Sequence, residues 1–197
     1  MFTGIIETTG KVKNIEIRGT NISFWIESTL SSELKIDQSL SHDGVCLTVE
    51  AIHENKHKVT AIAETLEKTT LGNLEVNSPV NLERCMTLNG RLDGHIVQGH
   101  VDTVAECIDV VENDGSWQLE FLIPEKFSAF IIEKGSISLN GISLTIFDIT
   151  DTTFKVAIIP YTYHNTNISL IKKGQAVNIE FDLIGKYVFR FKELYNL

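Results

Sequence analysis

Short stretches rich in valine, isoleucine, threonine and phenylalanine alternate along the chain with polar stretches that contain glycine. Branched and aromatic side chains pack well on a pleated surface, so such stretches favour β-strands. The pattern predicts strands over Asn21–Glu27, Val45–Ile52, Lys58–Ala63, Pro79–Glu83, Gln118–Ile123, Ile142–Ile149, Phe154–Ile159 and Ala176–Phe181. Asn113-Asp114-Gly115 predicts a hairpin turn. Ser31–Ile36 and Lys126–Ile132 each allow one short helix.

This pattern occurs twice along the chain. The matching blocks are Phe2–Glu7 with Val97–Asp102, Asp43–Val49 with Asn140–Ile146, and Val80–Glu83 with Val177–Glu180. The offset is 97 − 2 = 95 for the first pair and 140 − 43 = 177 − 80 = 97 for the others. A period of this length is the size of a small domain rather than of a solenoid unit. The predicted fold is therefore all-β, with two tandem, similar six-stranded barrels, because closure hides the strand edges.

Glycines occur where the two copies agree, at Gly4 with Gly99 and at Gly44 with Gly141. One interpretation is a tight turn that needs a positive φ angle. The other is close approach of a ligand to bare backbone. The two interpretations are compatible.

The chain ends in a stretch with helical spacing of apolar residues. Tyr187, Val188, Phe191, Leu194 and Tyr195 form the stripe of an amphipathic helix, with Gly185 as a break before it. A helix this short is marginal alone in water, so it must pack on its own barrels or on other subunits. The predicted division is residues 1–95 and 96–184 for the barrels, and 185–197 for the helix.

Composition narrows the possible functions. The 197 residues carry a formal net charge of −9, which argues against a nucleic-acid-binding surface. Three cysteines without CxxC spacing argue against a disulfide scaffold and fit a reducing compartment. The start resembles no signal peptide, and no run of 18 apolar residues could cross a membrane. We therefore expect a cytoplasmic protein with no membrane partner.

Five sequence blocks carry a family resemblance through both halves of the chain. They are MFTGIIE (Met1–Glu7), GVCLTV (Gly44–Val49), GHIVQGHVD (Gly94–Asp102), KGSISLNGISLT (Lys134–Thr145) and IPYTYHNTN (Ile159–Asn167). Together they resemble the riboflavin synthase α-chain family. The resemblance implies two Greek-key barrels followed by a C-terminal helix, assembled as a homotrimer. It leaves open any association with lumazine synthase.

The resemblance also implies the chemistry. Each barrel would bind one molecule of 6,7-dimethyl-8-ribityllumazine, two per chain, and the working site would form between barrels of different subunits. A four-carbon unit would pass between the two substrates, giving riboflavin and 5-amino-6-(D-ribitylamino)uracil without metal or organic cofactor. Two similar pockets held face to face would align identical reactants, a chiefly entropic gain.

His100 and Ser143 are the main catalytic candidates. His100 stands where the first copy has Ile5, and a neutral imidazole could move a proton from a substrate methyl group. Ser143 is the repeat partner of Cys46. With His100 nearby, Ser143 could add to an electrophilic ring carbon or position a water that does. Each residue also has a structural interpretation: His100 could be a histidine with a satisfied hydrogen bond, and Ser143 and Cys46 could be small residues packed inside a barrel. Cys46 fits a role in lining the pocket better than a role as a nucleophile.

Two charged residues complete the catalytic set. Lys134 and Asp182 would each pass for ordinary solvated charges, but both coincide with charged positions that the family places at its inter-subunit site. Their first-copy counterparts are Asp37 and Cys85, so the halves differ there. His95 and His100 are five residues apart and would point to opposite faces of a strand, so we expect no metal site.

The substrate-binding set follows two equivalent strips, because Thr48 and Thr145 share a strand face with Cys46 and Ser143. In the first copy the set is Phe2, Gly4, Ile5, Ile6, Ser39, Cys46, Leu47, Thr48, Thr60, Ala61, Ile62, Ala63, Glu64 and Thr65. In the second it is Gly99, His100, Val101, Lys134, Ser143, Leu144, Thr145, Ile159, Pro160, Tyr161, Thr162, Tyr163 and His164. Tyr161, Tyr163 and His164 depart from the family pattern, which puts contacts to the ribityl chain in doubt.

Two other functions compete with the enzyme. A non-catalytic lumazine- or flavin-binding protein of the same fold needs a pocket but no chemistry. A flavin reductase barrel does not explain the duplication. The joint presence of His100, Ser143, Lys134 and Asp182 favours the enzyme.

Overall fold

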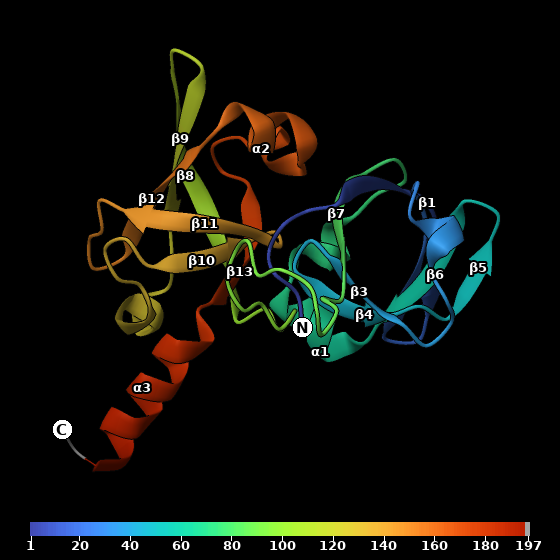
Figure 1. Cartoon of the computed structure of the whole chain (residues 1–197), viewed down its shortest axis with the longest axis horizontal. Coiled ribbons are helices and arrows are strands. Elements are labelled where there is room, and N and C mark those ends of the chain that lie inside the picture. Colours follow the sequence, from blue (N-terminus) through green and yellow to red (C-terminus); the bar gives the residue numbers. More distant parts are fainter. Residues whose placement is uncertain (196–197) are drawn as a thin grey trace.

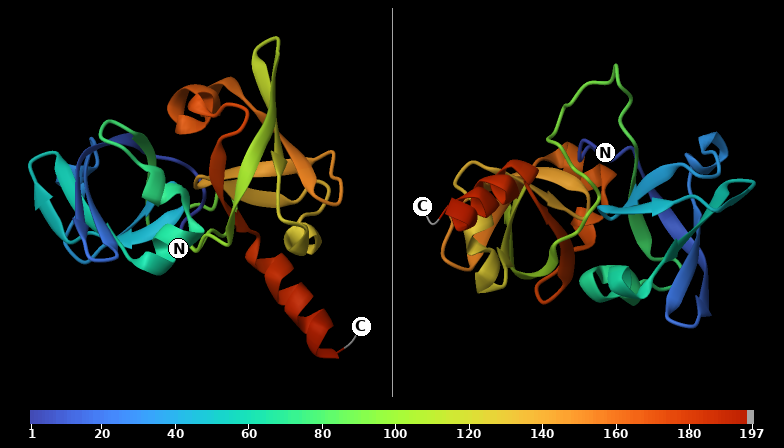
Figure 2. Two further views of the ribbon diagram at one scale, coloured as in Figure 1. Left: turned by 180° about the vertical axis from the view of Figure 1, so that it is seen from behind. Right: turned by 90° about the horizontal axis from the view of Figure 1, so that it is seen from below.

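The computed structural model describes residues 1–195 and is mostly β. Two barrel-like sheets, one from each half of the chain, lie side by side, and helix α3 (Leu183–Tyr195) extends away from the second (Figure 1). The connection between the last strand of the first sheet and the first strand of the second arches out from their junction (Figure 2). The duplicated β fold expected from the sequence is confirmed.

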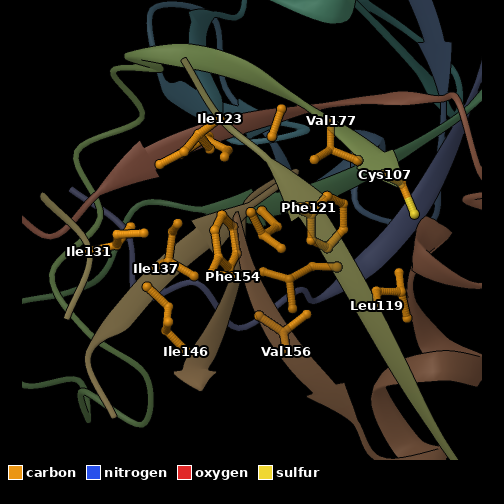
Figure 3. Close-up of a cluster of buried hydrophobic side chains, with 14 of the residues drawn as sticks. Cys107, Leu119, Phe121, Ile123, Ile131, Ile137, Ile146, Phe154, Val156 and Val177 are labelled. Atoms are coloured by element: carbon orange, nitrogen blue, oxygen red, sulfur yellow. The ribbon is translucent and has the colours of Figure 1, made fainter. Parts of the chain in front are cut away.

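The second half forms a closed antiparallel barrel. Its strands are β8 (Thr103–Asn113), β9 (Ser116–Leu122), β10 (Ser136–Leu139), β11 (Ile142–Phe147), β12 (Thr153–Ile158) and β13 (Ala176–Phe181). Around the barrel they follow the Greek-key order β10-β11-β12-β9-β8-β13. Asp114 and Gly115, at φ 40° and 93°, form the predicted turn between β8 and β9. Phe121, Phe154 and Val156 lie at the centre of its core (Figure 3).

The first half is an open seven-stranded sheet. Its strands are β1 (Thr8–Arg18), β2 (Asn21–Glu27), β3 (Ser39–His42), β4 (Val45–Thr48), β5 (Ala51–His53), β6 (Lys56–Ala61) and β7 (Pro79–Arg84), in the order β4-β3-β7-β1-β2-β6-β5. The closed six-stranded barrel expected here is a half-barrel instead. The predicted strand Val45–Ile52 is divided into β4, which pairs with β3, and β5, which pairs with β6. The bond from Glu50 N to Lys58 O, 2.8 Å, joins the chain between β4 and β5 to β6, where Ile146 and Phe147 pair with β12 in the second barrel.

Short helices bridge the strands at equivalent places in the two halves. The two predicted ones appear as 3₁₀ turns, η1 (Ser31–Glu33) and η3 (Glu125–Phe130). The pattern missed two helical pairs, which are α1 (Ala63–Lys68) with η2 (Thr70–Asn73) and α2 (Pro160–Asn165) with η4 (Asn167–Leu170). In each pair a threonine side chain caps the second helix, because Thr69 and Thr166 accept the backbone N–H two residues on.

Helix α3 begins two residues before the predicted break. Gly185 therefore lies in its first turn rather than ahead of it, because Asp182 accepts a hydrogen bond from Ile184 N (3.0 Å) and so caps the helix N-terminus. Phe189 packs against Phe130 with ring centroids 4.9 Å apart, which ties the helix to the second barrel. The predicted helix extended to Leu197, and its last two positions lie outside the described residues.

The segments that lead into the two halves are exchanged. Ile6, just before β1, packs against the core of the second barrel, and Val101, just before β8, packs against the core of the first. The offset of 101 − 6 = 95 makes these two residues repeat partners. Each half therefore completes its apolar surface with a residue from the lead-in segment of the other.

Candidate functional site

The two lead-in segments cross each other at the junction of the halves. Phe2 and Val97 exchange backbone hydrogen bonds of 2.7 and 3.1 Å. A buried carboxylate holds each segment. Glu83 accepts from the backbone N–H groups of Thr3 (2.7 Å) and Gly4 (3.0 Å). Its repeat partner Glu180 accepts from the corresponding second segment, at Gln98, Gly99 and His100.

Each crossing segment contacts the strand that carries a candidate residue. The carbonyl of Gly4 accepts from the backbone N–H of Ser143 (2.7 Å), and that of Gly99 accepts from Cys46 (2.9 Å). Both glycines have positive φ, and a Cβ on Gly4 would lie 2.6 Å from the Cβ of Ser143. The positive-φ interpretation of these glycines is confirmed, and their close neighbours are Ser143 and Cys46. Approach of a ligand to these glycines stays a prediction.

A cavity of about 510 Å³ opens on the outer wall of the second barrel. This is a volume suited to a small organic ligand. The lining residues are Ile5, Asp93, Gly94, Lys134, Ser136, Ser143, Leu144, Thr145, Phe147, Ala157, Ile159 and Thr162. We call this the Ser143 cavity. Its wall includes seven residues of the predicted substrate-binding set, which the fold gathers from the first lead-in segment, the turn before β10, β11 and the start of α2.

The hydrogen-bond partner of Ser143 is His95 rather than His100. Ser143 Oγ lies 2.7 Å from Nδ1 of His95, in the connection between the two halves. The backbone N–H of His100 is bonded to Glu180, and its neighbour Gly99 contacts Cys46 of the first half. Ser143 and His100 are therefore not paired within one chain, and the expected nearness of the two residues stays a prediction for a site between subunits. Sequence reasoning weighed His95 only as a metal ligand, since it has no repeat partner.

The charged candidates lie beside this cavity in different ways. Lys134 lines it, with Nζ 5.5 Å from the centroid of the Phe147 ring and 3.6 Å from the carboxylate of Glu133. Asp182 lines a neighbouring cavity of about 470 Å³ at the root of α3. Ser136 borders both cavities. The fold therefore places Lys134 in the same cavity as Ser143, and Asp182 in the adjoining cavity.

The equivalent wall of the first half has different chemistry. Thr60 donates to Glu50 (2.9 Å) and lies 2.8 Å from the Ser23 hydroxyl, whereas the second barrel has Ala157 and Phe147 at the positions of Thr60 and Glu50. Cys46 is half-buried, and burial raises the pKa of its thiol. A neutral thiol is a poor nucleophile, which agrees with a pocket-lining role.

Several predicted contact residues have side chains that are buried or that pack outside the cavity. The side chains of Leu47 and Ala61 are buried in the core of the first half, and Phe2 is fully buried at the junction. In the other half, Tyr163 stacks on Trp117 with a centroid distance of 3.5 Å and an interplanar angle of 6°. His164 meets the same indole edge-on, and neither side chain lines the Ser143 cavity.

Two features of residues 1–195 bear on other functions. Within that range no group of three histidine, cysteine, aspartate or glutamate side chains is arranged to hold a metal ion. The helices of the same range are all too short or too polar to cross a membrane.

Comparisons with known proteins place these features in context. A lumazine binding domain model matches the chain twice, at residues 3–85 and 98–182. The riboflavin synthase of Actinobacillus pleuropneumoniae is 42% identical over 97% of this chain and 89% of its own length. That of Bacillus subtilis (strain 168) is 38% identical over the same shares. That of Schizosaccharomyces pombe is 36% identical over 98% of this chain and 94% of its own length.

Solved structures show the same fold. LumP complexed with riboflavin superposes with a TM-score of 0.86 at 24% identity, covering 92% of this chain and 99% of that one. LumP complexed with 6,7-dimethyl-8-(1'-D-ribityl) lumazine gives a TM-score of 0.84 at 23% identity over the same shares.

Proposed function

The chain belongs to the riboflavin synthase family, and we infer that it converts two molecules of 6,7-dimethyl-8-ribityllumazine into riboflavin and 5-amino-6-(D-ribitylamino)uracil. The observation that carries this conclusion is full-length similarity to riboflavin synthases at 36–42% identity, with a lumazine binding domain in each half. The binding-only alternative rests on LumP, whose likeness at 23–24% identity concerns the fold.

Each half binds one substrate molecule. The Ser143 cavity is the pocket of the second half, and the wall around Cys46, Thr48 and Thr60 is the pocket of the first. The cavity volume of about 510 Å³ and the repeat of the strips support this assignment. Because Glu50 and Thr60 replace Phe147 and Ala157 in the first pocket, the two identical substrates meet unlike surroundings. One can therefore give carbons while the other accepts them.

The working site lies between subunits of a homotrimer. Within one chain His100 follows Gly99, whose carbonyl accepts from Cys46 in the first half. A His100–Ser143 pair therefore requires the first half of one subunit to face the second half of another. The assembly has an available contact surface in α3, whose side chains Tyr187, Val188 and Phe191 are all more than half exposed. Burying such a stripe is the ordinary driving force for association.

The candidate residues have distinct roles in this reaction. His100 moves the proton of a substrate methyl group, and Ser143 adds to an electrophilic ring carbon or positions a water that does. Lys134 offers positive charge beside the heterocycle, where negative charge develops after proton loss. Asp182 lines the adjoining cavity at the root of α3. The three free cysteines agree with a reducing compartment, and we assign the protein to the cytoplasm.

Incubation of the purified protein with dimethylribityllumazine tests the function directly. Riboflavin absorbance should appear without added metal or nucleotide and should survive EDTA. Tight lumazine binding with no riboflavin would favour the binding-only alternative. Activity lost on chelation and restored by a divalent ion would contradict the absence of a metal from the mechanism.

A further inference from the structure

The two proposed pockets carry different charges at matching positions. Lys134 and Phe147, which we call the second rim, line the Ser143 cavity. Their repeat partners Asp37 and Glu50 form the first rim, since 134 − 37 = 147 − 50 = 97. We propose that the pockets select ligands by charge: a ribityl ligand that carries a phosphate ester binds in the second pocket and is excluded from the first. This inference rests on the two pockets of the proposed function.

Lys134 and Asp37 occupy the same place in the backbone of their halves. Both residues have a positive φ, 63° and 70°. The N–H of Lys134 donates to the carbonyl of Ile146, and the N–H of Asp37 donates to that of Val49, each at 2.9 Å. Ile146 and Val49 are themselves repeat partners. The two side chains therefore start from equivalent points and bring opposite charges to them.

Phe147 and Glu50 are also equivalently placed. Glu50 N donates to Lys58 O (2.8 Å), and Phe147 pairs with Lys155, which is the repeat partner of Lys58. The Glu50 carboxylate accepts a hydrogen bond from the Thr60 hydroxyl (2.9 Å), on the strip of predicted substrate contacts. This carboxylate therefore lies against the wall of the first pocket, where the second pocket has an apolar ring.

The second rim presents a cation at the mouth of its cavity. The Nζ of Lys134 lies 5.5 Å from the centroid of the Phe147 ring, and its side chain is 73% exposed, so a ligand can reach the ammonium group. Glu133 lies 3.6 Å from the same Nζ, and Asp93 in the cavity wall pairs with Arg91 at 3.1 Å. The two cations and two carboxylates around this rim balance.

The first rim has no such balance. Among the ion pairs of residues 1–195, none includes Asp37 or Glu50. Lys58, whose carbonyl accepts from Glu50 N, pairs through its side chain with Glu16 (3.7 Å). The first rim therefore carries two negative charges with no cation beside them.

This difference acts on charged ligands and spares neutral ones. A phosphate monoester carries about −1.5 to −2 charges at neutral pH, and lysine binds phosphate as a point charge. Both exchanges make the first rim more negative, so the preference has the same sign at any point along the rim. Riboflavin and the lumazine carry a neutral ribityl chain, and the rims do not discriminate between them.

Charge selection gives the reaction a means of control. Two substrates must be bound together, so a ligand that fills the second pocket alone is enough to stop turnover. Phosphoryl transfer to riboflavin converts the product into such a ligand. Flavin mononucleotide, the phosphate ester of riboflavin, should therefore inhibit riboflavin formation by competing with one of the two lumazine molecules.

Titrations with riboflavin and with flavin mononucleotide test the proposal. Riboflavin should fill about two sites per chain, as the proposed function requires. Flavin mononucleotide should fill about one, with the other site weaker by at least about tenfold, because bringing like charges together is costly. The preference should shrink between ~0.05 M and ~0.5 M salt, because added ions screen exposed charges. Equal filling of both sites by flavin mononucleotide, or binding to neither, would overturn the proposal.

Blocking variants identify the site that is filled. Thr145→Trp, which fills the Ser143 cavity, should abolish binding of flavin mononucleotide, and Thr48→Trp in the first pocket should leave it. The reverse result would place the phosphate ester in the first pocket and contradict charge selection.

Exchange of the rim residues tests the cause. Lys134→Asp should weaken flavin mononucleotide at least about tenfold and change riboflavin affinity less than about threefold, since the effect is Coulombic. Asp37→Lys/Glu50→Phe should raise the number of sites for flavin mononucleotide from one to about two. Lys173→Asp, at an exposed lysine outside the Ser143 cavity, is the control with the same charge change and should alter neither ligand. Equal weakening of both ligands by Lys134→Asp would overturn the proposal.

These measurements separate failure of this inference from failure of the proposed function. A wild-type protein that binds no riboflavin would remove the pockets and the proposed function with them. A protein that binds both ligands as expected but makes no riboflavin would remove the proposed reaction and leave charge selection standing. Two riboflavin sites that take flavin mononucleotide equally would remove this inference alone.

Discussion

His42 Nε2 lies 2.9 Å from His57 Nε2 inside the core of the first half. His42 Nδ1 is 3.1 Å from the Leu40 carbonyl, and His57 Nδ1 is 2.8 Å from the Ser31 hydroxyl. Every ring nitrogen is satisfied if His42 donates to Leu40, His57 donates to His42, and Ser31 donates to His57. That arrangement requires both rings to be neutral, so protonation of either one breaks it.

We expect acid to destabilise the fold through this pair. Burial lowers the pKa of His42 well below its usual value and that of His57 to about 4. Because an unfolded histidine titrates near ~6.5, the unfolded chain binds more protons below that pH. The stability is thus fully present above ~6.5 and is lost as the pH falls toward the folded pKa values. Thermal melts between pH 7 and pH 4 should show a falling Tm.

The second barrel supplies the control for this effect. It has Leu139 and Phe154 at the positions of His42 and His57, which are 97 residues earlier. A His42→Leu/His57→Phe variant should lose much of the Tm decrease between pH 6.5 and pH 4. An unchanged pH dependence in that variant would assign acid sensitivity to other groups.

A second prediction concerns Asp43, whose repeat partner is Asn140. Both residues have φ 46°. Asp43 Oδ1 accepts the backbone N–H of Asn81, and Asn140 Oδ1 accepts that of Asn178, each at 2.8 Å. Burial raises the pKa of Asp43 to about 7. A raised carboxyl pKa gives stability that is present below the unfolded value near ~3.9 and lost as the pH rises to about 7. Asp43→Asn should therefore raise Tm by several degrees at pH 8 and little at pH 4.

The mirror substitution provides the test of cause. Asn140→Asp places a carboxyl at the matching buried position and should lower Tm at pH 8 more than at pH 4. Calorimetry of Asp43→Asn at pH 4 and pH 8 checks this account. Equal destabilisation at the two pH values would contradict it.

The helix α3 should control assembly. Tyr187 and Phe191 lie one turn apart on its exposed apolar stripe and are 71% and 56% exposed. Tyr187→Glu/Phe191→Glu would put charges where we expect other subunits, so the variant should sediment mainly as monomer and make little riboflavin. Arg190→Glu on the polar side of the helix is the control. A double variant that remains trimeric would show that the stripe is not the assembly surface.

Ligand titration should find two unequal sites per chain. The strips of the two halves are similar, but Glu50 and Thr60 differ from Phe147 and Ala157. Calorimetry with riboflavin should therefore resolve about two equivalents of different affinity. Thr145→Trp should block the site in the Ser143 cavity, and Thr48→Trp the other. Loss of both sites from either single substitution would contradict independent pockets.

The sequence by itself determined the repeat, the β character of both halves and most of the Ser143 cavity. These features are local or periodic: strand propensity follows from branched side chains, and the repeat places Ser143 and Thr145 opposite Cys46 and Thr48 whatever the packing. The short helix α1 was missed because its six residues carry no full apolar period. The position of Gly185 inside α3 depended on a cap, Asp182, that propensity does not reveal.

Only the tertiary structure decided which residues meet across the junction. His95 is 48 residues from Ser143, and its approach depends on crossing segments held by Glu83 and Glu180, on contacts of Gly4 and Gly94, and on the fold of both halves at once. The repeat placed His100 at the position of Ile5 but could not tell which half that position faces. Because the lead-in segments are exchanged, Ile5 lies at the cavity of the second half and His100 lies beside Gly99, which contacts the first half. This exchange results from long-range packing and not from a local sequence pattern.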